Sequence, residues 1–96
     1  MNTMSSNKII NVARPVLKRA GVKRSSLFGS RARAENHQGS DVDILVEMPK
    51  NRDLLDFVRL KLDLEDRLGH KVDLVTYSGL SPFIKKQVLK EHIKIL

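Results

Sequence analysis

Hydrophobic residues near the start of the chain recur three or four positions apart and predict a first helix. The positions that share this apolar face are Ile9, Ala13, Val16, Leu17 and Ala20. Gly21, a residue type that commonly follows a helix end, marks where the helix stops. Pro15 lies inside the pattern, so we expect it either to kink the helix or to begin its second part.

Three later segments are predicted to be strands. Residues 22–28 (VKRSSLF) run into Gly29, and residues 71–77 (KVDLVTY) form another extended segment. Between them lies a strand with two different faces, in which Val42, Ile44 and Val46 alternate with Asp41, Asp43 and Leu45. Pro49 ends this strand, and the polar, turn-rich residues 30–40 precede it.

A second helix is predicted over residues 53–68, closed by Gly69. Its broad apolar face comprises Leu54, Leu55, Phe57, Val58, Leu62, Leu64 and Leu68. Lys61 and Glu65 interrupt this face four residues apart, and we interpret them as an ion pair at its edge.

The last part of the chain predicts one more helix. Ser81 and Pro82 form an N-cap and first-turn pair, after which Ile84 and Val88 are expected to face inward. Residues 93–96 (IKIL) can add a short edge strand. The element order predicts a single small α/β domain over residues 1–96, with helices flanking a mixed sheet.

The composition limits the cellular compartments and the kinds of chemistry that can be expected. The 96 residues contain no cysteine, which excludes disulfides, thiolate metal sites and a cysteine nucleophile. The longest apolar run has three residues, far below the roughly 20 that span a bilayer. The first ten residues lack the apolar core of a signal peptide. We therefore expect a cytoplasmic protein without a membrane segment.

The charges are unevenly distributed along the chain. The net charge is +7, residues 1–34 hold eight basic residues and no acidic one, and ten of the eleven acidic residues lie in residues 35–73. Such a chain suits an anionic ligand, whether a nucleotide, a nucleic acid or an acidic partner. An ordinary solvated surface is the alternative, and the distribution alone does not separate them.

Three carboxylates lie inside apolar strands. Asp41 and Asp43 share one face of their strand because side chains alternate, and Asp73 lies between Val72 and Leu74. If the two strands are neighbours, the three like charges converge and require a counter-charge. Mg²⁺ prefers carboxylate oxygens, and two such ions can clamp a displacement at phosphorus. An Asp-x-Asp pair on a surface strand without any metal is the alternative.

Gly29 and Ser30 come directly after a predicted strand. Glycine allows a phosphate to approach the backbone closely, and backbone amides with a serine hydroxyl can hold phosphate oxygens. A Gly-Ser pair alone is most often a turn. Ten residues before Asp-x-Asp, it joins a candidate triphosphate site to a candidate metal site.

The segments LFGSRARAENHQGSDVDILVE and LGHKVDLVTY resemble the minimal nucleotidyltransferases of the DNA polymerase β-like superfamily. The signature of that family is Gly-Ser, ten residues, Asp-x-Asp and a third Asp on a later strand. Gly29, Ser30, Asp41, Asp43 and Asp73 match it. The resemblance covers residues 9–96 and implies the polymerase β-like nucleotidyltransferase fold.

The resemblance also implies roles for single residues. Asp41 and Asp43 would bind two Mg²⁺ ions, and Asp73 would complete the catalytic metal site and orient or deprotonate the attacking hydroxyl. Gly29 and Ser30 would bind the β- and γ-phosphates of ATP. Other candidate nucleotide contacts are Arg31, Arg33 and Ser40. The two arginines could instead brace the loop, and Ser40 could cap the turn.

The function implied is transfer of AMP from ATP to a hydroxyl. Small free-standing members of the family are typically antitoxins that adenylylate a tyrosine of a HEPN-domain toxin. The alternatives are a non-catalytic antitoxin that acts by binding alone and a small-molecule nucleotidyltransferase that needs a partner subunit. Direct nucleic-acid binding is disfavoured, because Phe28, Phe57 and Phe83 are expected in the core and leave no stacking platform. Lys86, Lys90 and Lys94 form a basic stripe that either is solvated or binds a partner.

Overall fold

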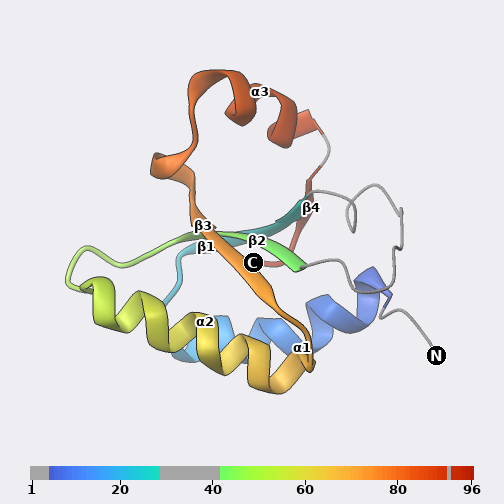
Figure 1. The fold of residues 1–96 in the computed structure, drawn as a ribbon, viewed down its shortest axis with the longest axis vertical. Helices are drawn as coiled ribbons and strands as arrows, with labels where there is room; N and C mark the ends of the chain where they lie inside the picture. Colours follow the sequence, from blue (N-terminus) through green and yellow to red (C-terminus); the bar gives the residue numbers. More distant parts are fainter. Residues whose placement is uncertain (1–4, 29–41, 91) are drawn as a thin grey trace.

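The computed structural model describes residues 5–28, 42–90 and 92–96. Its elements are α1 (Ser6–Arg19), β1 (Arg24–Phe28), β2 (Val42–Glu47), α2 (Leu54–Leu68), β3 (Val72–Thr76), the 3₁₀ turn η1 (Tyr77–Gly79), α3 (Pro82–Lys90) and β4 (Ile93–Lys94). The four strands form one sheet in the order β3-β2-β1-β4. In Figure 1, α1 and α2 lie on one side of this sheet, and η1 and α3 lie on the other. The predicted α/β fold with a mixed sheet is confirmed.

Helix α1 forms where the apolar spacing predicted it. The Ser5 side chain accepts a hydrogen bond from the Lys8 backbone N–H and so caps the first turn. Pro15 lies inside one uninterrupted helix. After the helix, Gly21 takes φ +80, a left-handed conformation that a side chain would strain.

The sheet is mixed because β2 has a different orientation relative to each neighbour. Strand β1 pairs antiparallel with β2, and β3 pairs parallel with β2. Val42, Ile44 and Val46 of β2 are fully buried with residues of α1 and α2 in the hydrophobic core. Short strand β4 pairs antiparallel with β1, so the expected strand at the chain end is confirmed. Alternation then places Asp43 on the sheet face opposite α1 and α2.

Helix α2 begins with a capping box between Asp53 and Asp56 and ends at Gly69, which takes φ 70. The Asp56 backbone N–H donates to the Asp53 carboxylate, and this hydrogen bond lowers the pKa of Asp53 below its usual value. Lys61 and Glu65 approach to 4.0 Å, which confirms the predicted ion pair.

The predicted apolar face of α2 is wrong in part. Leu64 and Leu68 are buried as expected, together with Leu60, which the sequence pattern had omitted. The face that was expected to be covered includes four exposed side chains: Leu54, Leu55, Val58 and Leu62. The apolar arc is wider than the stripe that α1 and the sheet cover, because a helix packed on one side buries only part of its circumference.

Helix α3 lies over the face of the sheet that carries Asp43 (Figure 1). Ile84 and Val88 of this helix were predicted to face inward. Val88 is half-buried, and the side chain of Ile84 lies outside the described residues. Phe83 was expected in the core, and this prediction is wrong. It lies in the first turn of α3, is 92% exposed and is not part of the core cluster. Within the described ranges, no helix is long and apolar enough to cross a membrane.

Candidate functional site

Two of the three predicted carboxylates lie side by side on neighbouring strands. Asp43 of β2 is in direct register with Asp73 of β3 across the parallel pair. Neighbouring strands in a sheet lie about 4.7–4.9 Å apart. The flanking residues Val42, Val72 and Leu74 are buried in the core under the helices, so both carboxylates belong to the opposite face. Asp43 is half-buried and Asp73 is exposed, so a ligand can reach the pair from the Asp73 side.

The local backbone explains why this pair forms. The Val42 backbone N–H donates to the Lys71 carbonyl over 2.9 Å and so fixes the start of β2 beside the start of β3. The Glu65 carboxylate accepts a hydrogen bond from the Val72 N–H over 2.9 Å, which connects the start of β3 to α2. Each carboxylate is the second residue of its strand, and the pairing of β2 with β3 continues for three more residues after them.

Strand β1 ends at the same edge of the site. Phe28, its last residue, pairs with Asp43 on the side away from Asp73. Gly29 follows Phe28 directly in the chain. The other predicted site residues, which are Gly29, Ser30, Arg31, Arg33, Ser40 and Asp41, lie outside the described residues. Their predicted roles therefore stay predictions.

The described carboxylates suit a hard cation. Two carboxylates in register offer the oxygen ligands that Mg²⁺ selects, and a cation between them offsets their mutual repulsion. No group of three or more His, Cys, Asp or Glu side chains with metal-binding geometry occurs within residues 5–28, 42–90 and 92–96. The third predicted ligand, Asp41, is not among these residues.

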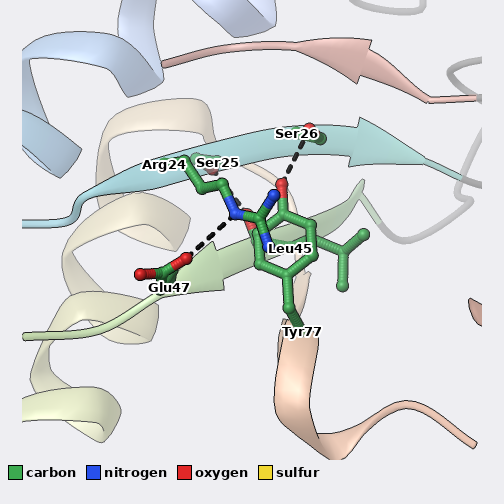
Figure 2. A network of polar contacts seen from close by, with 6 residues as sticks. All are labelled: Arg24, Ser25, Ser26, Leu45, Glu47 and Tyr77. Carbon is green, nitrogen blue, oxygen red and sulfur yellow. Dashed lines mark hydrogen bonds and ion pairs between the residues drawn. The ribbon is translucent and has the colours of Figure 1, made fainter. Parts of the chain in front are cut away.

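A polar network lies further along the same sheet face (Figure 2). The Tyr77 and Ser26 hydroxyls form a hydrogen bond of 2.8 Å. The Arg24 guanidinium lies 4.1 Å from the centroid of the Tyr77 ring and pairs with Glu47 over 2.9 Å. This network joins the end of β3 to β1 across β2 and so holds the strand alignment that places Asp43 beside Asp73. It was not predicted from the sequence, since Ser26 and Tyr77 lie 51 residues apart in the chain.

Replacing Tyr77 by Phe is expected to lower the free energy of unfolding by about 1–3 kcal/mol, because the buried Ser26 hydroxyl loses its partner. Urea denaturation followed by circular dichroism measures this. In the Tyr77→Phe background, Ser26→Ala should cost clearly less than it does alone, since the partner is already gone. Strictly additive costs would show that the two hydroxyls do not interact in solution.

Sequence comparisons place the chain in a family. Residues 9–95 match the model of the nucleotidyltransferase domain. A relative from Methanocaldococcus jannaschii, named "Putative protein adenylyltransferase MJ0435", is 46% identical over 93 residues, covering 97% of this chain and 100% of that protein. "Protein adenylyltransferase MntA" of Thermococcus cleftensis is 44% identical over 77 residues, covering 80% of this chain and 78% of that protein.

Solved structures agree with this assignment. One described as "putative minimal nucleotidyltransferase" superposes with a TM-score of 0.83 at 40% identity, covering 97% of this chain and 98% of that one. A toxin–antitoxin structure with AMP-PNP superposes with a TM-score of 0.79 at 26% identity, covering 91% and 72% of the two chains. This chain belongs to the nucleotidyltransferase domain family and is an enzyme of its minimal nucleotidyltransferase group.

Proposed function

We propose that this enzyme is an antitoxin that transfers AMP from ATP to a tyrosine hydroxyl of a HEPN-type toxin, in a reaction that requires Mg²⁺. The observation that carries the proposal is the register of Asp43 with the exposed Asp73, beside the strand end from which Gly29 and Ser30 follow. In this proposal, the Gly-Ser backbone after β1 would bind phosphate, and the paired carboxylates of β2 and β3 would bind the metal next to it.

Each residue has a defined task in this proposal. Asp41 and Asp43 would hold Mg²⁺, which neutralises phosphate charge when it is bound. Gly29 and Ser30 would hold the β- and γ-phosphates, with Arg31 and Arg33 as further phosphate contacts and Ser40 beside the nucleotide. Asp73, exposed at the rim of the pair, would accept a hydrogen bond from the acceptor hydroxyl and orient it.

The chemical step is an in-line displacement at the α-phosphorus. The tyrosine oxygen forms the new P–O bond, and the bond from the α-phosphorus to the oxygen bridging to the β-phosphate breaks. The leaving group is pyrophosphate, and the hydroxyl proton passes to the Asp73 carboxylate. The reacting oxygen must be held about 3–3.5 Å from phosphorus for this to be efficient, so the acceptor has to dock firmly.

Similar proteins support the proposed nucleotide substrate and the proposed toxin partner. The toxin–antitoxin structure noted above contains AMP-PNP. Another similar structure is described as a tri-AMPylated Shewanella oneidensis HEPN toxin in complex with an MNT antitoxin; it matches at 27% identity with a TM-score of 0.63 and covers 94% of this chain and 67% of that one. The named relatives are protein adenylyltransferases, so a protein acceptor is favoured over a small molecule.

AMP transfer is expected to depend on a divalent cation. Purified toxin is incubated with this chain and with ATP that carries a radioactive α-phosphate. The toxin should become radioactive in the presence of Mg²⁺ and stay unlabelled in EDTA, as gel autoradiography would show. Equal labelling in EDTA would contradict the metal site. Unlabelled toxin under both conditions, with folded toxin and antitoxin, would contradict the proposed transfer itself.

A further inference from the structure

Helix α2 exposes a row of large apolar side chains. Leu54 is 76% exposed, Leu55 57%, Val58 40% and Leu62 56%. Residues 54, 58 and 62 are spaced by four, which places them one above another on one side of the helix, with residue 55 next to them. We call these four residues the outer α2 flank. Isolated exposed leucines are common, but four on one helix face form a contiguous patch of the kind that marks interaction sites.

The outer α2 flank points away from α1 and adjoins β3. On the other side of the helix, Arg59, Leu60 and Asp63 line a hollow together with residues of α1. On the β3 side, a hollow of about 550 Å³ is lined by Met48, Leu54, Phe57, Leu74, Val75 and Thr76, among others. In Figure 1, α2 lies in front of α1 and beside β3. The flank therefore continues onto the strand at its Leu54 end.

Strand β3 is an edge strand. In the strand order β3-β2-β1-β4 it pairs with β2 alone among the described strands. The outer backbone groups of an edge strand are available to a second chain, and proteins commonly cover such edges. Asp73 lies on this same strand and is exposed, whereas Asp43, one strand further in, is half-buried. An acceptor that reaches the carboxylate pair therefore arrives over the β3 edge.

We infer that the outer α2 flank and the edge of β3 together form the surface on which the modified toxin docks. The inference rests on the proposed function, because it takes the acceptor to be a protein. A toxin that presents a tyrosine at Asp73 meets the β3 edge. Beyond this edge, on the sheet face opposite Asp73, Leu54 of the flank lines a hollow with Leu74 and Thr76. By contacting both sides of the β3 edge, one partner covers the apolar surface and also holds its hydroxyl at the exposed Asp73 carboxylate.

The charge of the chain favours such a partner over a second copy. Two copies, each with a net charge of +7, repel when they approach, whereas a partner with a negative net charge is attracted. Residues 53–68 carry five acidic and three basic side chains, so the surface on the toxin should be apolar at its centre with charges of both signs around it. Apolar centres with polar rims are the usual anatomy of protein interfaces.

The test compares two neutral substitutions of similar kind. In the double variant Leu55→Gln plus Leu62→Gln, two exposed leucines become polar without a change in charge or helix propensity. The matched control is Phe83→Gln, which removes an apolar side chain that is 92% exposed on α3. Calorimetry gives the affinity for the HEPN-type toxin of the proposed function, and transfer kinetics give KM and kcat for the same toxin.

We expect the double variant to bind the toxin at least about tenfold more weakly, because it makes two apolar side chains polar at the proposed centre of the interface. Its KM for toxin should rise in parallel, while kcat at saturating toxin and the affinity for ATP stay within about twofold of wild type. Phe83→Gln should behave as wild type. If wild type modifies the toxin and the double variant does so with unchanged KM, the docking surface is wrong and the proposed function stands.

Two other outcomes would also overturn the inference. If wild type neither binds nor modifies the toxin, the proposed function fails, and the docking surface fails with it. If sedimentation velocity shows wild type alone to be a dimer and the double variant a monomer, the flank is covered by a second copy instead of the toxin.

Discussion

Replacing Asp73 by Asn is expected to reduce AMP transfer at least about 100-fold, because residues that only support a metal ligand already cost 10–100-fold when they are changed. Asn keeps the size of the side chain but loses the negative charge and most of the basicity. It can neither take the acceptor proton nor balance a cation next to Asp43. Initial rates of pyrophosphate release in the presence of toxin measure the effect.

The fold should tolerate this change. Asp73 is exposed, and in the absence of metal its charge repels the Asp43 carboxylate that lies in register with it. We therefore expect the melting temperature of Asp73→Asn in EDTA to equal or exceed that of wild type. Lys71→Gln, a neutralisation of an exposed residue just before the same strand, serves as the control and should retain activity. An active Asp73→Asn variant would remove Asp73 from the mechanism.

The largest loss of stability is expected from Leu64→Ala. Leu64 is fully buried in the core cluster between α1, α2 and the sheet, and emptying such a site costs about 2–5 kcal/mol. Small domains are stable by only about 5–15 kcal/mol, so this single change would take a large share of the total. Urea denaturation measures it.

Leu62→Ala is the matched control, because it is the same substitution two residues away on the same helix. Leu62 is 56% exposed, so the cost should stay within about 0.5 kcal/mol. Equal losses at the two positions would mean that α2 is rotated in solution relative to the structure described above. They would also remove the exposed flank on which the docking surface depends.

Much of the fold followed from local signals. Asp53 and Gly69 delimit α2, Pro82 begins α3, and the alternation from Val42 to Val46 predicted a two-faced strand. These signals work because helix ends and strand faces depend on residues close in sequence. The nearness of Asp43 and Asp73 was predicted only on condition that their strands were neighbours. In the structure β2 and β3 are neighbours, so the condition is met. The sequence alone could not show this, because strand order depends on contacts between residues that are distant in sequence.

The wrong predictions concern which apolar side chains are buried by a neighbouring helix or strand. Helical periodicity placed Leu54, Leu55, Val58 and Leu62 on an apolar face, but only the surrounding elements decide how much of that face is buried. Phe83 was assigned to the core because its residue type is usually buried, but it is 92% exposed. Tyr77 was overlooked because its partner Ser26 lies 51 residues away in the chain. Local pattern carries no information about such a pair.

The most direct test of the account is the intact mass of the HEPN-type toxin after co-expression with this chain. With wild type, the toxin should gain the mass of one or more AMP units, located on tyrosine by fragmentation, and cells should grow. With Asp41→Asn plus Asp43→Asn, the toxin should keep its unmodified mass and growth should stop, although the variant antitoxin remains folded. An unmodified toxin with wild type, together with full protection by the double variant, would contradict enzymatic neutralisation and show that binding alone suffices.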